Sequence, residues 1–90
     1  MAISEADYAY EVGETFIGVR GAGFSLSSHD VALITEWYEA GVPLHIPVKV
    51  LGEIAERRRA RGERVRALSY IREEVDARFA EWLEMRVGAH

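Results

Sequence analysis

The sequence contains no cysteine, which excludes disulfide bonds, thiolate metal sites and a cysteine nucleophile. It also has no stretch approaching the roughly 18 consecutive apolar residues that a membrane-spanning helix needs. The first ten residues, MAISEADYAY, are acidic and lack the apolar run of a secretory signal. From these absences we expect a cytoplasmic protein that does not associate with membranes.

Residue groupings typical of catalytic or metal sites are missing as well. None of the three histidines shares a helical i,i+3 or i,i+4 spacing with a partner that could complete a zinc site. The carboxylate pairs Glu73/Glu74 and Glu81/Glu84 fall on the outward faces of a predicted helix, which suits solvation better than acid–base catalysis. We therefore expect no enzymatic activity, no cofactor and no metal.

The chain does have enough apolar residues to build a core. Of its 90 residues, 49% are hydrophobic and 10% are aromatic, which rules against a disordered chain. Ninety residues are too few to close two cores, so we expect residues 1–90 to form a single domain. Apolar residues recur at helical spacing in four segments, and no segment is convincing as a strand.

The first two segments open with the same helix-start pattern, S-x-x-D. Ser4 and Asp7 open the first, and a hydroxyl at that place can accept a hydrogen bond from a free backbone N–H. Its apolar face is expected from Tyr8, Val12 and Phe16, and its end from Gly18, Gly21 and Gly23. Ser27 and Asp30 open the second, with an expected stripe of Val31, Ile34, Trp37 and Tyr38 before Gly41.

The third helix is expected to start near Pro43 or Leu44, with Pro47 in its first turn, where its missing N–H costs nothing. Val50, Leu51, Ile54 and Ala55 would face inward before Gly62. Ser69 is predicted to cap the fourth helix, whose stripe is Ile71, Val75, Phe79, Trp82 and Leu83, ending at Gly88. The short links predict an all-α fold, a compact bundle of about four helices.

Six arginines lie between Glu56 and Arg66, in a chain of net charge −4. One interpretation is structural. Arginines in the last turn of a helix interact favourably with its dipole, at about 0.3–1 kcal/mol each, and pairs such as Glu53–Arg57 and Glu56–Arg59 would add about 0.2–0.5 kcal/mol. The cluster would then be a solvated helix end, in which the stem of Arg58 covers the edge of the core.

The second interpretation is a binding surface for nucleic-acid phosphates. Arg64 and Arg66 continue the cluster into the following loop, where the dipole argument no longer applies. Tyr70 comes next, and arginines beside an aromatic ring are the components of a single-strand binding surface. The candidate nucleic-acid-binding residues are Arg57, Arg58, Arg59, Arg61, Arg64, Arg66 and Tyr70.

The order of these features resembles the DnaD-type domain, the C-terminal helical module of bacterial and phage replication-initiation proteins. The resemblance rests on a helix ending in Phe16, then FSLSSHDVALITEWYEAGVPL, a helix with a basic end, and SYI opening a last helix with a tryptophan. It covers residues 8–82. It implies a DNA-associated accessory role in primosome assembly or helicase loading, with DNA or a replication protein as partner.

The closing motif departs from the family pattern. That pattern resembles Y-x-x-x-I-x-x-x-W, whereas here Glu74 and Arg78 stand at the spacings after Tyr70, and Trp82 follows one turn late. Only Tyr70, Ile71 and Trp82 can be carried over. An alternative is a small protein–protein adaptor or homo-oligomer without a nucleic-acid role, which would use an uncovered stripe of the fourth helix. Its candidate partner-binding residues are Phe79 and Trp82.

Overall fold

The computed structural model describes residues 3–21 and 25–88 of the chain. These residues form four α-helices, α1 (Glu5–Arg20), α2 (Ser28–Ala40), α3 (His45–Arg59) and α4 (Arg72–Gly88), with a short 3₁₀ helix, η1 (Leu68–Ile71), before α4. No strand occurs within these ranges. The predicted all-α bundle of four helices is confirmed.

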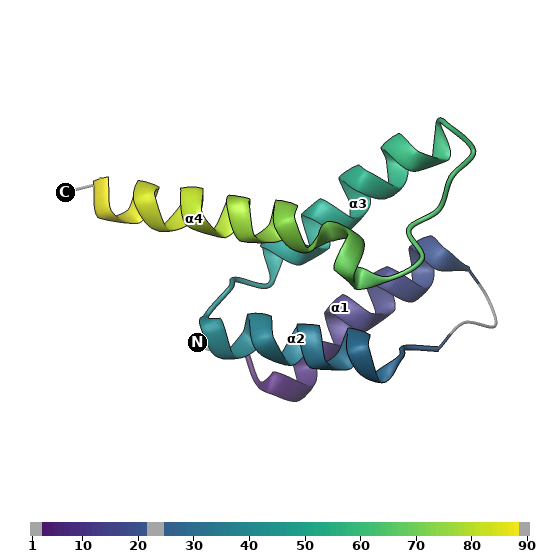
Figure 1. Cartoon of the computed structure of the whole chain (residues 1–90). Helices are drawn as coiled ribbons and strands as arrows, with labels where there is room; N and C mark the ends of the chain where they lie inside the picture. Colours follow the sequence, from purple (N-terminus) through teal and green to yellow (C-terminus); the bar gives the residue numbers. More distant parts are fainter. Residues whose placement is uncertain (1–2, 22–24, 89–90) are drawn as a thin grey trace.

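Successive helices run in alternating directions, so that α1 and α3 both end on the right of Figure 1. α1 packs against α2 and α3, η1 contacts α2, α3 and α4, and α4 packs on α3. The second half of α4 extends away from the other helices (Figure 1). None of the helices in the described ranges combines the length and the apolarity that crossing a membrane would require.

The helix ends form largely as the sequence predicts. Ser4 accepts a hydrogen bond from the Asp7 N–H, and Ser27 and Asp30 form a reciprocal capping box. Gly41 and Gly62 have positive φ of 84° and 74°, a backbone conformation that glycine adopts without steric cost. Gly18, predicted to help end the first helix, lies inside α1 and the end comes at Gly21, while Gly23 lies outside the described residues.

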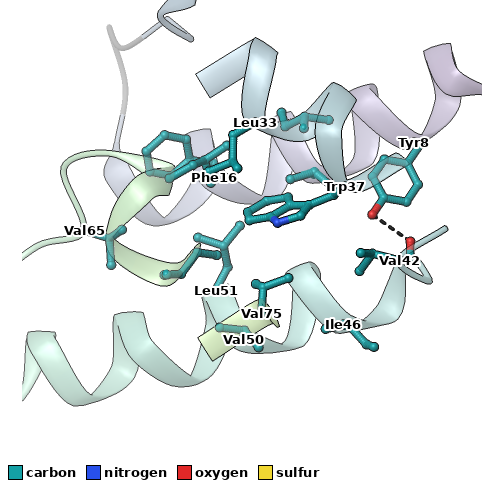
Figure 2. Packing of buried hydrophobic residues seen from close by; sticks show 14 of the residues in the cluster. Tyr8, Phe16, Leu33, Trp37, Val42, Ile46, Val50, Leu51, Val65 and Val75 are labelled. Atoms are coloured by element: carbon teal, nitrogen blue, oxygen red, sulfur yellow. Dashed lines mark hydrogen bonds between the residues drawn. The ribbon is translucent and has the colours of Figure 1, made fainter. Parts of the chain in front are cut away.

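One hydrophobic core joins all the helices (Figure 2). The predicted faces of α1 and α3 are confirmed, since Tyr8, Val12, Phe16, Val50 and Leu51 are buried. The other members of the core come from α2, α3, η1, the start of α4 and the connections: Leu33, Ile34, Trp37, Val42, Ile46, Ala55, Val65, Leu68, Ile71 and Val75.

Three sequence predictions of packing and capping are wrong. Val31 is 46% exposed, and Leu33 takes the buried position in its place. Ser69 caps nothing, because η1 precedes α4 and has no side-chain cap. Leu83 is 44% exposed, since the end of α4 extends beyond the helices that could cover it.

Tyr8 provides a test of the core by pH. Its hydroxyl donates a hydrogen bond of 2.8 Å to the Val42 carbonyl (Figure 2), and burial raises its pKa from 10 to about 12. The folded state therefore resists ionisation of the phenol, whereas the unfolded state ionises near pH 10. The stability associated with the neutral phenol is complete below pH 10 and is lost between about pH 10 and 12.

We expect Tyr8 to account for about 2–3 kcal/mol of the loss in stability over that window. The measurement is urea unfolding at pH 8, 10 and 11.5 for the wild type and for Tyr8→Phe. Tyr8→Phe should be less stable at pH 8 by about 1 kcal/mol, because the Val42 carbonyl loses its partner. It should then lose less stability between pH 10 and 11.5, and a parallel decline of the two proteins would contradict the assignment.

Candidate nucleic-acid interface

The end of α3 is built to reverse the chain and expose arginines. The Glu63 N–H donates to the Arg58 carbonyl (2.7 Å) and the Gly62 N–H to the Arg59 carbonyl (3.0 Å), the hydrogen-bond pattern of a Schellman motif. With Gly62 at positive φ, this motif satisfies the last carbonyls of the helix. The next residues return alongside the bundle instead of continuing outward.

The returning segment, residues 60–67, contains one buried valine between two exposed arginines. Val65 is buried in the core, whereas Arg64 and Arg66 on either side of it are exposed. Leu68 is also fully buried, and its N–H donates to Asp30 Oδ1 of α2 at 3.1 Å. These two anchors hold the backbone against the bundle and leave the two guanidinium groups on its outer side.

The end of α1 contributes a seventh arginine to the same region. Arg20 lies in the last turn of α1, and its guanidinium donates a hydrogen bond to the Arg66 carbonyl. We call this region the arginine corner and define it by the residues Arg20, Arg57, Arg58, Arg59, Arg61, Arg64, Arg66 and Tyr70. The structure thus brings together every nucleic-acid-binding residue proposed from the sequence, and it adds Arg20.

Tyr70 lies on the surface of η1 beside these arginines. It is 54% exposed, and the Arg58 guanidinium lies over its ring, 5.1 Å from the centroid. An arginine at this distance from an aromatic face makes a cation–π contact. The guanidinium of Arg58 is therefore held over an exposed ring, while the side chain as a whole is half-buried.

Acidic neighbours neutralise only part of the cluster. Arg59 pairs with Glu56 at 3.1 Å and Arg61 with Glu63 at 3.5 Å, and all four side chains are more than half exposed. Exposed pairs of this kind contribute about 0–1 kcal/mol and exchange readily for other partners. Within the described ranges Arg57, Arg58, Arg64 and Arg66 form no ion pair.

The predicted Glu53–Arg57 pair is not formed. Glu53 instead pairs with Arg78 of α4, which also bonds Glu74 at 2.9 Å. The hydrogen bond from Arg78 holds the pKa of Glu53 below its usual value. This network joins α4 to α3. Glu53 pairs with Arg78 of the neighbouring helix and not with Arg57 of its own next turn, because packing brings Arg78 closer.

The surface of the corner is hollowed in three places that follow one another. The first hollow, about 260 Å³, is lined by Arg57, Arg58, Arg61 and Tyr70 with Ile54, Glu73 and Glu74. The second, about 390 Å³, shares Arg58 and Tyr70 with the first and adds Gly62, Glu63, Arg64 and Arg66. The third, about 190 Å³, is lined by Arg20, Arg64 and Arg66.

A fourth hollow of about 460 Å³ lies on the other side of Arg20 and Arg64, along the end of α1, with Gly18, Val19, Gly21, Arg59, Gly62 and Glu63 as its other lining residues. Each hollow shares lining side chains with the next, so the four lie next to one another around the end of α3. Tyr70 borders the first two, and arginines border all four.

The proposed partner-binding residues lie elsewhere, on α4. Phe79 and Trp82 are half-buried and stack with their centroids 6.0 Å apart, and the Arg86 guanidinium lies 4.6 Å from the Trp82 centroid. Leu83 and Met85 next to them are exposed. A hollow of about 160 Å³ between Trp82 and the start of α3 is lined also by His45, Ile46, Lys49 and Arg78.

Within residues 3–21 and 25–88, no three acidic or histidine side chains come together as metal ligands would.

Sequence reasoning missed Arg20 because it is 46 residues from Arg66 in the chain. One signal could have found it: in an up-and-down bundle the first and third helices end on the same side.

No family model, no curated protein and no solved structure matches the chain.

Proposed function

We propose that the arginine corner binds the phosphate backbone of single-stranded nucleic acid, with a base stacked at Tyr70. The observation that carries this proposal is the series of adjacent hollows, in which arginines accompany an exposed aromatic ring. A positively charged groove beside a stacking platform is the arrangement with which proteins bind single strands.

An extended single strand fits these features better than a duplex. The bases of a duplex are stacked on each other, so that the ring of Tyr70 would have no free base to contact, whereas an unpaired base can stack for about 1–3 kcal/mol. The overall charge of −4 disfavours contact with a polyanion over the rest of the surface. Binding would therefore be confined to the corner.

The arginines of the α1 and α3 ends also have a structural role. Cations at a helix C-terminus are favourable, which explains Arg20, Arg57, Arg58 and Arg59 without any ligand. It does not explain Arg64 and Arg66, which lie beyond the last turn of α3. These two side chains, held outward by the burial of Val65, are the strongest support for a phosphate-binding role.

The resemblance to the DnaD-type domain would place such binding in replication initiation. Of the positions that can be carried over, Tyr70 is in the arginine corner, Ile71 is in the core and Trp82 is on α4. A replication accessory that holds a single strand and a second protein would need two separate surfaces of this kind. We propose that the single-strand binding serves replication initiation in this way.

Anisotropy titrations with labelled single- and double-stranded oligonucleotides test the proposal. We expect the single strand to bind more tightly at 50 mM salt. If about four phosphates are contacted, the plot of log K against log salt should have a slope near −2.8, at about −0.7 per contact. The absence of binding at 50 mM salt, or a slope near zero, would contradict it.

The second candidate is self-association through α4, favoured by the exposure of Leu83 (44%) and Met85 (75%) beside Trp82. A second copy could cover the part of α4 that extends beyond the bundle (Figure 1). The oligonucleotide titration described above distinguishes the two candidate functions. If α4 is the working surface, light scattering should report a dimer while neither oligonucleotide binds.

A further inference from the structure

The third hollow of the arginine corner differs from the others in its charge. Arg20, Arg64 and Arg66 line it, and no carboxylate is among its described lining residues. Glu73 and Glu74 border the first hollow, and Glu63 borders both the second hollow and the one along α1. The third hollow therefore has the most positive lining of the four.

The fold brings the three arginines to one hollow and orients the guanidinium of one of them. Arg20 is oriented by its hydrogen bond to the Arg66 carbonyl, and this bond joins the end of α1 to residues 60–67. Arg64 and Arg66 flank the buried Val65, and both of them line this hollow. Binding groups that are already in position lose less conformational entropy when a ligand arrives.

A ligand for this hollow should carry more than one negative charge on a compact group. An internal phosphodiester carries a single charge, whereas a phosphate monoester carries about −1.5 to −2 at pH 7 and has three acceptor oxygens. Arginine forks are well suited to bind such oxygens in pairs. The volume of about 190 Å³ suits one small group and not a base with its sugar.

We infer that the hollow of Arg20, Arg64 and Arg66 binds a phosphate monoester, and that in nucleic acid this is the terminal phosphate of a strand. The inference rests on the proposed single-strand binding, because the rest of the strand would follow the neighbouring hollows past Tyr70. The protein would thus recognise phosphorylated strand ends in preference to internal positions.

The test uses one internally labelled oligonucleotide in three forms, with a 5′-phosphate, a 3′-phosphate or neither. One of the phosphorylated forms should bind about fivefold more tightly than the unphosphorylated form at ~0.1 M salt, as one added contact predicts. This preference should decrease at pH 5, because the second ionisation of a phosphate monoester has a pKa near 6.

Arg64→Gln should abolish the preference, since Arg64 lines the hollow. Arg61→Gln is the matched control: it removes an exposed arginine of the same corner that does not line this hollow, and it should lower all three affinities while the preference remains. A nucleoside monophosphate should compete only at far higher concentration than the phosphorylated strand.

The outcomes separate this inference from the proposed function. Equal affinity for all three oligonucleotides overturns the terminal-phosphate site and leaves single-strand binding intact. If none of them binds, both proposals are wrong. Retention of the preference in Arg64→Gln also overturns the site. If the nucleoside monophosphate competes as strongly as the phosphorylated strand, the assignment of the site to strand ends is wrong.

Discussion

Replacing Asp30 with alanine should lower the free energy of unfolding by about 2–5 kcal/mol. The side chain is buried in the core, with 4% exposure, and both of its oxygens are used. Oδ2 accepts from the Ser27 N–H at 3.1 Å and completes the capping box of α2. Oδ1 accepts from the Leu68 N–H at 3.1 Å and fixes the start of η1.

The expected loss has two components. Removal of the capping interaction costs about 0.5–2 kcal/mol. Loss of a hydrogen bond to a charged acceptor costs about 1.5–3 kcal/mol, and the buried Leu68 N–H would be left without a partner. Asp30→Asn should fall between the wild type and Asp30→Ala, because its single carbonyl oxygen can replace only one of the two acceptors.

Asp7→Ala is the matched control in urea unfolding. Asp7 occupies the same place in the S-x-x-D start of α1, but it is exposed and only its backbone N–H takes part in the cap. Asp7→Ala should lower the free energy of unfolding by at most about 1 kcal/mol, because only the interaction of the carboxylate with the helix dipole is lost. Equal destabilisation by the two alanine variants would show that the Leu68 contact contributes nothing.

Asp30 also illustrates what the sequence can predict and what it cannot. Its role in the α2 start follows from a spacing of three residues, and local spacing also predicts the burial of Tyr8, Val12 and Phe16 and the stop at Gly41. Its bond to Leu68 spans 38 positions. No local pattern encodes such a contact, because it depends on how the helices pack.

The wrong predictions have the same origin. Glu53 and Arg57 have the correct spacing for a pair on one helix, yet Arg78 from α4 competes successfully for the carboxylate. Val31 belongs to the apolar stripe by type, but the face that α2 turns to the core is set by Asp30, Leu33, Ile34 and Trp37. Tertiary packing decides both outcomes.

The candidate site is more local, and the sequence predicts most of it. Six of its seven arginines and Tyr70 lie within residues 57–70. A Schellman turn at Gly62 and the burial of Val65 are enough to place them on one surface. Local spacing does not predict the contact of Arg20 with this segment or the hollow that it lines with Arg64 and Arg66, because both depend on how the helices pack.

Replacing Arg61, Arg64 and Arg66 together with glutamine should weaken binding to an unphosphorylated single strand about 100-fold at ~0.1 M salt. Three lost phosphate contacts at about 0.7 each should reduce the salt slope from near −2.8 to near −0.7. These arginines lie beyond the end of α3, and among residues 3–21 and 25–88 their only ion pair is the exposed one with Glu63. The unfolding free energy should therefore change by less than about 1 kcal/mol.

The matched control replaces Lys49, Arg72 and Arg86 with glutamine. It removes the same number of positive charges from residues that line none of the four hollows of the arginine corner. If binding depends on the corner, the control should keep its salt slope and lose less than about threefold in affinity, through long-range electrostatics only. An equal loss of affinity in both triple variants would show that net charge, and not the path past Tyr70, governs the interaction.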